Sequence, residues 1–388
     1  MHVTGESIAL SGKSHIANSP IWRIAIAIFG IFLCLIGGQT ILQSLFAAPN
    51  STGHGAAGFS LTGALWAALC VTSAICAIIL LARGFGSRLG YHWIALLVGI
   101  ALMSGATSGD IVLFLLAAGL LLRSQNHVIA ASLAFTAMML LQPVMAAVLI
   151  YFVLRADWRM ARWGLGMGAA AILASFPLDW PNLIEAAQRF VSSPLSAGPD
   201  NQSAYGFVQR MFDDPALVPV FMAPTVALAG VLAVVGLHLG KNDDVDEDAR
   251  PGPTPAILLL ECSLIVALAM ACGLLTKGSH MAVALAGLAG ALIVGLERIR
   301  AKSKHANVWT LAILAWIPPV LLALLPDLQT GKILAGSGGA IALFLAGAST
   351  AVVLWRERKA AAEIVIPQRP FGKRRRSAQP APAAIRAS

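Results

Sequence analysis

Long apolar runs recur along the whole chain, and they restrict its fold more than any other feature. They cover residues 21–47, 59–82, 91–107, 109–122, 127–141, 143–154, 162–178, 216–239, 255–275, 280–297, 308–325 and 333–355. A helix needs about 20 apolar residues to cross a bilayer. The runs are continuous, whereas the strands of a membrane barrel alternate between apolar and polar residues. We therefore predict an all-α fold, a polytopic integral membrane helical bundle with about twelve passes.

The composition agrees with a membrane protein and argues against a nucleic-acid-binding protein. Of the 388 residues, 58% are hydrophobic and 12% are charged, about half the charged fraction of a typical soluble protein. The net charge is +9, but the basic residues lie beside apolar runs and in the C-terminal tail, which favours contact with anionic membrane lipids. The five cysteines lie inside apolar runs, so we expect small core residues and predict no metal site.

The runs 127–141 and 143–154 are both shorter than a helix that crosses a bilayer at right angles. They are separated at Gln142 and Pro143, and proline bends or ends a helix because it lacks a backbone N–H. Irregular backbone at membrane depth occurs where it packs inside protein or lines a cavity. We therefore expect short broken helices in this region.

Basic residues gather in alternate loops, and this asymmetry predicts an orientation. The loops on one side contain Arg83, Arg88, Arg123, Arg155, Arg159, Arg162, Arg298, Arg300, Lys302, Lys304, Arg356, Arg358 and Lys359. Cytoplasmic loops carry such an excess, so we place both termini in the cytoplasm. The predicted organisation is a cytoplasmic segment at 1–20, a transmembrane domain at 21–355 and a basic, disordered tail at 356–388. An acidic stretch at 240–254 is expected to form a cytoplasmic loop.

The longest loop on the opposite side, 179–215, contains two amphipathic segments. Four consecutive hydrogen-bonding residues stand between them: Asp200, Asn201, Gln202 and Ser203. Ser203 is a suitable N-cap for the second segment, and free N–H groups at a helix start suit a phosphate or a sugar hydroxyl. Arg210 adds a charged donor for a phosphate. The alternative is that both segments are connectors that seal one end of the bundle.

The segment "NQSAYGFVQR" resembles the Asn-Gln-Ser-x-x-Gly-x-x-x-Arg pattern of the family 87 glycosyltransferases, membrane enzymes of the GT-C class. The matching residues are Asn201, Gln202, Ser203, Gly206 and Arg210. The layout of residues 105–300 is also similar. Gly109 and Asp110 open a helix, Gln142 and Pro143 separate a pair of short helices, and His280 stands where the family has a histidine.

The resemblance implies a GT-C-like fold and an inverting transfer of a hexosyl residue, mannosyl in some members. The implied donor is a polyprenyl-phosphate sugar, the acceptor lies at the outer face of a bacterial inner membrane, and no cofactor is implied. The residues that would bind the substrate are Asn201, Gln202, Ser203, Arg210 and His280.

The sequence departs from the family at three places: Gln142 replaces the Lys of its Lys-Pro pair, Asp110 replaces the Gln of its Gly-Gln pair, and the general base is missing from its usual loop. The family places an acidic residue in the first outward loop, but "FAAPNSTGHGAAGF" contains neither Asp nor Glu. Sugar transfer requires a group that takes a proton from the acceptor hydroxyl, and Asp110, at a predicted outward helix start, is the candidate catalytic base. The alternative is that Asp110 only complements the helix macrodipole.

Two other functions are kept as alternatives. One is a catalytically silent relative that binds a polyprenyl lipid or scaffolds a cell-envelope enzyme, which the missing acid in the first loop favours. The other is a transporter, which the broken helices and Glu261, an ionisable residue within an apolar run, favour. Against a transporter, the two halves of the chain show no internal repeat.

Overall fold

The computed structural model describes residues 61–85, 89–103, 107–171, 173, 201–212, 217–237, 254–273, 276, 283–301, 303, 306–324 and 332–365. The predicted first span at 21–47, the acidic loop and the candidate residue His280 lie outside this part of the chain.

The described residues form helices and contain no strand, which confirms the all-α prediction. The helices described over their full length are α2 (Leu61–Gly84), α3 (Tyr91–Met103), α4 (Ser108–Ser124), α5 (Val128–Leu141), the 3₁₀ helix η1 (Pro143–Ala146), α6 (Ala147–Leu154), α8 (Ala204–Met211), α9 (Leu217–Leu237), α10 (Pro255–Cys272), α11 (Ala284–Arg300), α12 (Ala306–Leu324) and α13 (Lys332–Val365). Four described helices are long and apolar enough to cross a membrane, and their apolar parts are Ala64–Gly84, Leu217–Leu237, Pro255–Cys272 and Gly338–Lys359.

The predicted break at Gln142 and Pro143 is present. α5 ends at Leu141, Gln142 has an extended backbone, and Pro143 begins η1, which continues into α6. Proline suits a first helical turn, where its missing N–H leaves no bond unmade. The chain therefore enters the bundle along α5 and returns along η1 and α6.

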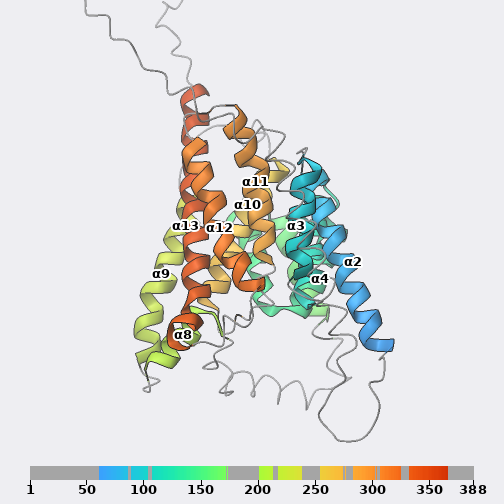
Figure 1. The fold of residues 1–388 in the computed structure, drawn as a ribbon, viewed down its shortest axis with the longest axis vertical. Coiled ribbons are helices and arrows are strands. Elements are labelled where there is room, and N and C mark those ends of the chain that lie inside the picture. Colours follow the sequence, from blue (N-terminus) through green and yellow to red (C-terminus); the bar gives the residue numbers. More distant parts are fainter. Residues whose placement is uncertain are drawn as a thin grey trace, which may run out of the picture.

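α10 is the central helix of the described bundle (Figure 1). It packs against α4, α6, α9, α11 and α13. Nearly every residue from Ala256 to Ala271 is buried, including Glu261. In Figure 1, α2, α3 and α4 stand to one side of α10 and α11, whereas α9, α12 and α13 stand to the other.

α13 extends to Val365, ten residues beyond the predicted end of the transmembrane domain. The extension is rich in Ala, Glu, Arg and Lys, which have high helix propensity. Two of its side chains also pack on the bundle: Glu357 accepts a hydrogen bond from Trp309 Nε1 at 2.9 Å, and Arg358 pairs with Glu261. The first part of the predicted tail is therefore an ordered helix.

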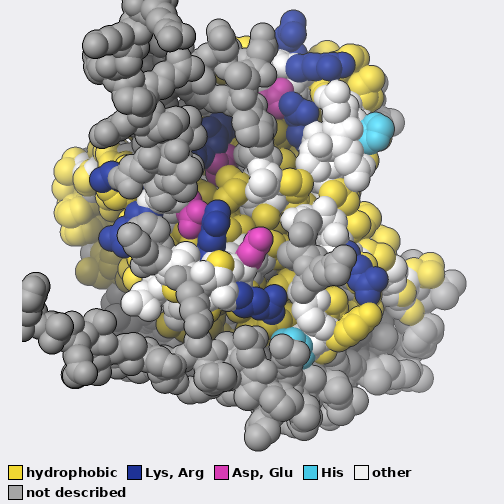
Figure 2. Space-filling view, turned by 90° about the horizontal axis from the view of Figure 1, so that it is seen from above, with side chains coloured by type: hydrophobic (Ala, Val, Ile, Leu, Met, Phe, Trp, Pro, Cys, Tyr) yellow, Lys and Arg dark blue, Asp and Glu magenta, His cyan; other side chains and the backbone are white. Residues whose placement is uncertain are grey.

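Charged side chains gather at the end of the bundle where α4 and α11 end and α10 begins, here called the charged end. Figure 2 shows basic and acidic side chains on this face. Three ion-paired groups lie there: Arg123 with Asp157, Arg298 with Glu357, and Glu261 with Arg155 and Arg358. Of the basic residues that predicted an orientation from the sequence, the four in these ion pairs lie at one end of the described structure.

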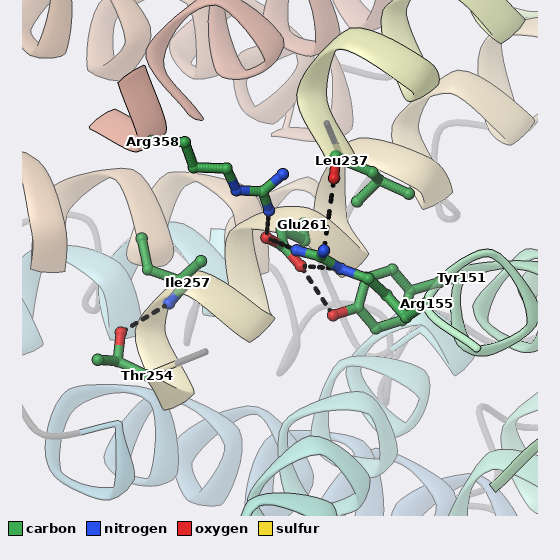
Figure 3. A network of polar contacts seen from close by, with 7 residues as sticks. All are labelled: Tyr151, Arg155, Leu237, Thr254, Ile257, Glu261 and Arg358. Atoms are coloured by element: carbon green, nitrogen blue, oxygen red, sulfur yellow. Dashed lines mark hydrogen bonds and ion pairs between the residues drawn. The ribbon is translucent and has the colours of Figure 1, made fainter. Parts of the chain in front are cut away.

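The Glu261 network is the most deeply buried of these groups (Figure 3). The Glu261 side chain is fully buried, whereas Arg155 and Arg358 are 28% and 24% exposed. Tyr151 Oη and Arg155 Nε each donate to Glu261 Oε2 at 2.9 Å. Arg358 donates to Oε1, so one carboxylate joins α6, α10 and α13. Arg155 also donates to the carbonyl oxygen of Leu237 at the end of α9.

Candidate functional site

The Asn-Gln-Ser residues form a fully buried turn before α8. The side-chain oxygen of Asn201 accepts three hydrogen bonds: from the Ser203 backbone N–H at 3.1 Å, from the Ser203 hydroxyl at 2.8 Å and from the Thr276 backbone N–H at 3.0 Å. The Asn201 side chain therefore holds its own turn together and ties it to the segment that follows α10.

Backbone contacts strengthen the connection between this turn and α10. The N–H of Gln202 donates to the carbonyl oxygen of Thr276 at 2.7 Å. The Thr276 hydroxyl in turn donates to the carbonyl oxygen of Met270, in the last turns of α10, at 2.6 Å. Ser203 is the N-cap of α8, as predicted, and its hydroxyl accepts from the Gly206 N–H at 3.1 Å.

Gly206 and Arg210 complete the same unit. A Cβ atom placed on Gly206 would lie 2.5 Å from Cγ of Asn201, so only glycine leaves space for the Asn201 side chain. Arg210 Nη1 donates to the Asn201 carbonyl oxygen at 3.0 Å. Burial lowers the pKa of the Arg210 guanidinium, which still carries its charge near neutral pH. We call Asn201, Gln202, Ser203, Gly206, Arg210 and Thr276 the loop clamp.

The loop clamp predicts a clear effect of Gly206→Ala. The added methyl group cannot enter without displacing Asn201, so we expect a loss of about 1–3 kcal/mol of unfolding free energy, as overpacking costs. Gly230 of α9 is a matched control, because a Cβ there would meet no atom within 4 Å. Gly230→Ala should leave the melting temperature unchanged or raise it slightly. Equal melting temperatures for both variants would show that the clamp does not require glycine.

Asp110 lies in the first turn of α4 and is 1% exposed. Its Oδ2 atom accepts a hydrogen bond from the Thr107 N–H at 3.0 Å, as an acid near a helix start does. Its Oδ1 atom is buried and has no hydrogen-bond partner among the described residues. The cap explains one oxygen of this carboxylate and leaves the other able to accept a proton or a hydrogen bond.

The structure brings four of the predicted site residues together and places Asp110 on a different helix. α8 packs against α9, α10 and α13, whereas α4 packs mainly against α2 and α5. Both helices begin at the end opposite the charged end, here called the site end, where Figure 1 shows α8. Within the described part of the chain, Asp110 forms no hydrogen bond with the loop clamp.

Thr276 is the clamp residue that sequence reasoning missed. It is fully buried and is bonded to Asn201 across 75 residues of sequence. Its position after Gly273, which follows the end of α10, marks it only as a loop residue. No feature of the sequence pairs it with the Asn-Gln-Ser pattern.

Comparison with known proteins identifies the family of this chain. The family model "Glycosyltransferase family 87" matches residues 41–249, which is more than half of the chain and includes Asp110 and Asn201 to Arg210. Comparisons with curated proteins and with solved structures give no match. Because this match covers more than half of the sequence, the chain belongs to glycosyltransferase family 87.

Proposed function

We propose that this protein transfers a hexosyl residue, such as mannosyl, from a polyprenyl-phosphate sugar to an acceptor at the outer face of a bacterial inner membrane. Family membership supports glycosyl transfer. The observation that carries the proposal further is the buried Asp110 carboxylate, whose Oδ1 atom lacks a partner among the described residues at the site end. A lipid-linked donor is consistent with a site in a membrane bundle.

In the proposed reaction, Asp110 acts as the general base. Its Oδ1 atom takes the proton of the acceptor hydroxyl while the hydroxyl oxygen forms a bond to the anomeric carbon of the sugar. The bond between that carbon and the phosphate oxygen breaks, and the polyprenyl phosphate leaves with the electron pair. One displacement inverts the anomeric configuration. The Thr107 N–H, bonded to Oδ2, holds the carboxylate in place.

The donor phosphate is assigned to the loop clamp. α8 begins at Ala204, just after the buried turn, and its first turn offers N–H groups and a partial positive charge. Arg210 donates through Nη1 to the Asn201 carbonyl, and its positive charge suits a phosphate. The side chain of Gln202, fully buried in the same turn, is assigned to the same ligand.

The proposed orientation places the charged end in the cytoplasm and the site end outside. The clustering of basic residues at one end supports this, because cytoplasmic loops carry the excess of Lys and Arg. Both termini are then cytoplasmic. The partners proposed for the protein are membrane lipids and the lipid-linked sugar.

Two substitutions separate ligand binding from the structural role of the clamp. Gln202→Ala keeps the backbone bond to Thr276, and Arg210→Gln keeps a donor for the Asn201 carbonyl but removes the charge. Each should weaken binding of a short-chain polyprenyl-phosphate mannose by about tenfold to a hundredfold, because hydrogen bonds to charged groups contribute about 1.5–3 kcal/mol. Binding to the purified protein in detergent is the measurement.

Stability must be measured on the same variants. Both are expected to melt within a few degrees of the wild type, whereas Asn201→Ala should lose stability, since it removes the acceptor of three hydrogen bonds. Unchanged donor binding in Gln202→Ala and Arg210→Gln would mean that the clamp is a connector only. Binding without transfer by the wild type would favour the catalytically silent relative.

A further inference from the structure

Gln142 has a buried side chain that the fold does not use. It is 1% exposed, and neither its Nε2 nor its Oε1 atom has a hydrogen-bond partner in the described residues. Its backbone, in contrast, is fully engaged: the N–H donates to Met138 and the carbonyl accepts from Met145, each at 2.9 Å. A buried amide without partners lowers the stability of the fold, so a ligand that hydrogen-bonds to the amide would explain why it is present.

Other buried polar groups without partners do not require a ligand in the same way. Thr136 Oγ1 and Ser263 Oγ also lack partners among described residues, but both are hydroxyls within helices. A helical hydroxyl satisfies itself by rotating toward the carbonyl four residues earlier. Gln142 stands at a helix end with an extended backbone, and its carboxamide has two donors and an acceptor to satisfy.

The packing of α4 against α5 places Gln142 near the level of Asp110. A Cβ atom on Gly119 would lie 2.6 Å from the ring of Phe135, so these residues face each other across the antiparallel pair. Gln142 follows Phe135 by about 10 Å along α5, and Asp110 precedes Gly119 by about 14 Å along α4, at about 1.5 Å per residue. Both displacements run toward the site end.

The break at Gln142 also lies beside the end of α10. A Cβ atom on Gly273 would lie 3.6 Å from Cγ2 of Val144 in η1. Gly273 ends α10, and Thr276, three residues later, is bonded to Asn201 of the loop clamp. Gln142 therefore stands at the junction of α5, which packs on the helix of the candidate base, and η1, which packs on the end of α10 just before the clamp residue Thr276.

From this placement we infer that Gln142 is a sugar-binding residue whose carboxamide holds two neighbouring hydroxyls of the donor's hexosyl group. Nε2 donates to one hydroxyl oxygen while Oε1 accepts from the other hydroxyl, so the two edges of the amide match a vicinal diol. A phosphate fits less well, because its oxygens only accept and would oppose Oε1 and the nearby Asp110 carboxylate. The inference rests on the proposed transfer from a lipid-linked sugar and names the residue that recognises the sugar.

The test compares the same lipid with and without the sugar, and because the sugar also turns the phosphate monoester into a less charged diester, the change in preference between variants is the decisive measurement. Short-chain polyprenyl-phosphate mannose and the same polyprenyl phosphate without sugar are bound to the wild type, Gln142→Leu and Thr136→Val. The wild type should prefer the sugar-bearing lipid by about tenfold, the scale of one or two hydrogen bonds. Gln142→Leu should lose this preference, bind the sugar-free lipid as the wild type does, and melt at the same or a higher temperature. Thr136→Val, which also removes a buried polar group on α5, should keep the preference.

The outcomes separate this inference from the proposed function. If Gln142→Leu keeps the preference, or the wild type shows none, Gln142 does not bind the sugar, even when the wild type transfers mannose. If the wild type prefers the sugar-bearing lipid through Gln142 but transfers mannose to no acceptor, the inference stands and the transferase proposal fails.

Discussion

Asp110→Asn should lower the rate of sugar transfer by about 10²- to 10⁴-fold, the contribution of a positioned general base. Asparagine keeps the size of the side chain and an oxygen that accepts the Thr107 N–H. It cannot take the acceptor's proton. Binding of the polyprenyl-phosphate sugar should therefore remain within about twofold of the wild type, since the proposed role of Asp110 is to remove a proton and not to hold the donor. Single-turnover transfer together with donor binding measures the two effects separately.

Asp157→Asn is the matched control for this substitution. Asp157 also caps a helix start, where its Oδ1 atom accepts the Met160 N–H at 3.2 Å, but it pairs with Arg123 at the charged end. Its replacement should leave transfer unchanged. If Asp110→Asn transfers sugar as fast as the wild type, Asp110 serves only as a helix-start acid and the base is a different residue.

The helices follow from the sequence because the bilayer leaves few alternatives. A backbone in hydrocarbon must satisfy its own hydrogen bonds, so each apolar run becomes a helix. The break at Gln142 and Pro143 can also be predicted from the local sequence, since it depends on the missing N–H of Pro143. α13 continues ten residues past the apolar run that ends at Trp355, because helix propensity and the contacts of Glu357 and Arg358 extend beyond the hydropathy signal.

The contacts of the candidate site depend on long-range packing and could be predicted only in part. The Ser203 cap lies within one turn of its partner, and the sequence predicts it correctly. The role of Asn201 was not accessible, because its partner Thr276 stands 75 residues away. The loop-clamp geometry now gives Gly206 a physical reason: its missing side chain is the space that Asn201 occupies.

The partners of Glu261 could not be predicted from the sequence either, and they bear on the transporter alternative. A carboxylate within an apolar helix requires partners, but its arginines stand 106 and 97 residues away in the sequence. Because Glu261 pairs with both arginines at the charged end, its burial within an apolar helix has a structural explanation. The transporter interpretation therefore loses one of the two observations that favoured it, and the other, the broken helix, belongs to the proposed sugar site.

Glu261→Gln should produce the largest loss of stability among single substitutions at the charged end. The carboxylate is fully buried and balances two arginines, so its loss leaves two guanidinium groups close together with no anion between them. Removing one partner of a buried ion pair costs about 3–5 kcal/mol. Both arginines are about one-quarter exposed, which favours the lower end of that range. Thermal unfolding of the purified protein in detergent measures the effect.

Glu357→Gln provides the comparison that tests burial as the cause. Glu357 is 17% exposed and pairs with Arg298, which is 48% exposed. Exposed ion pairs contribute about 0–1 kcal/mol, so this variant should unfold close to the wild type. Adding Arg358→Met to Glu261→Gln should restore part of the lost stability, because it removes one of the two arginines left without a carboxylate. If the double variant is no more stable than Glu261→Gln, the loss does not come from the unbalanced arginine charge.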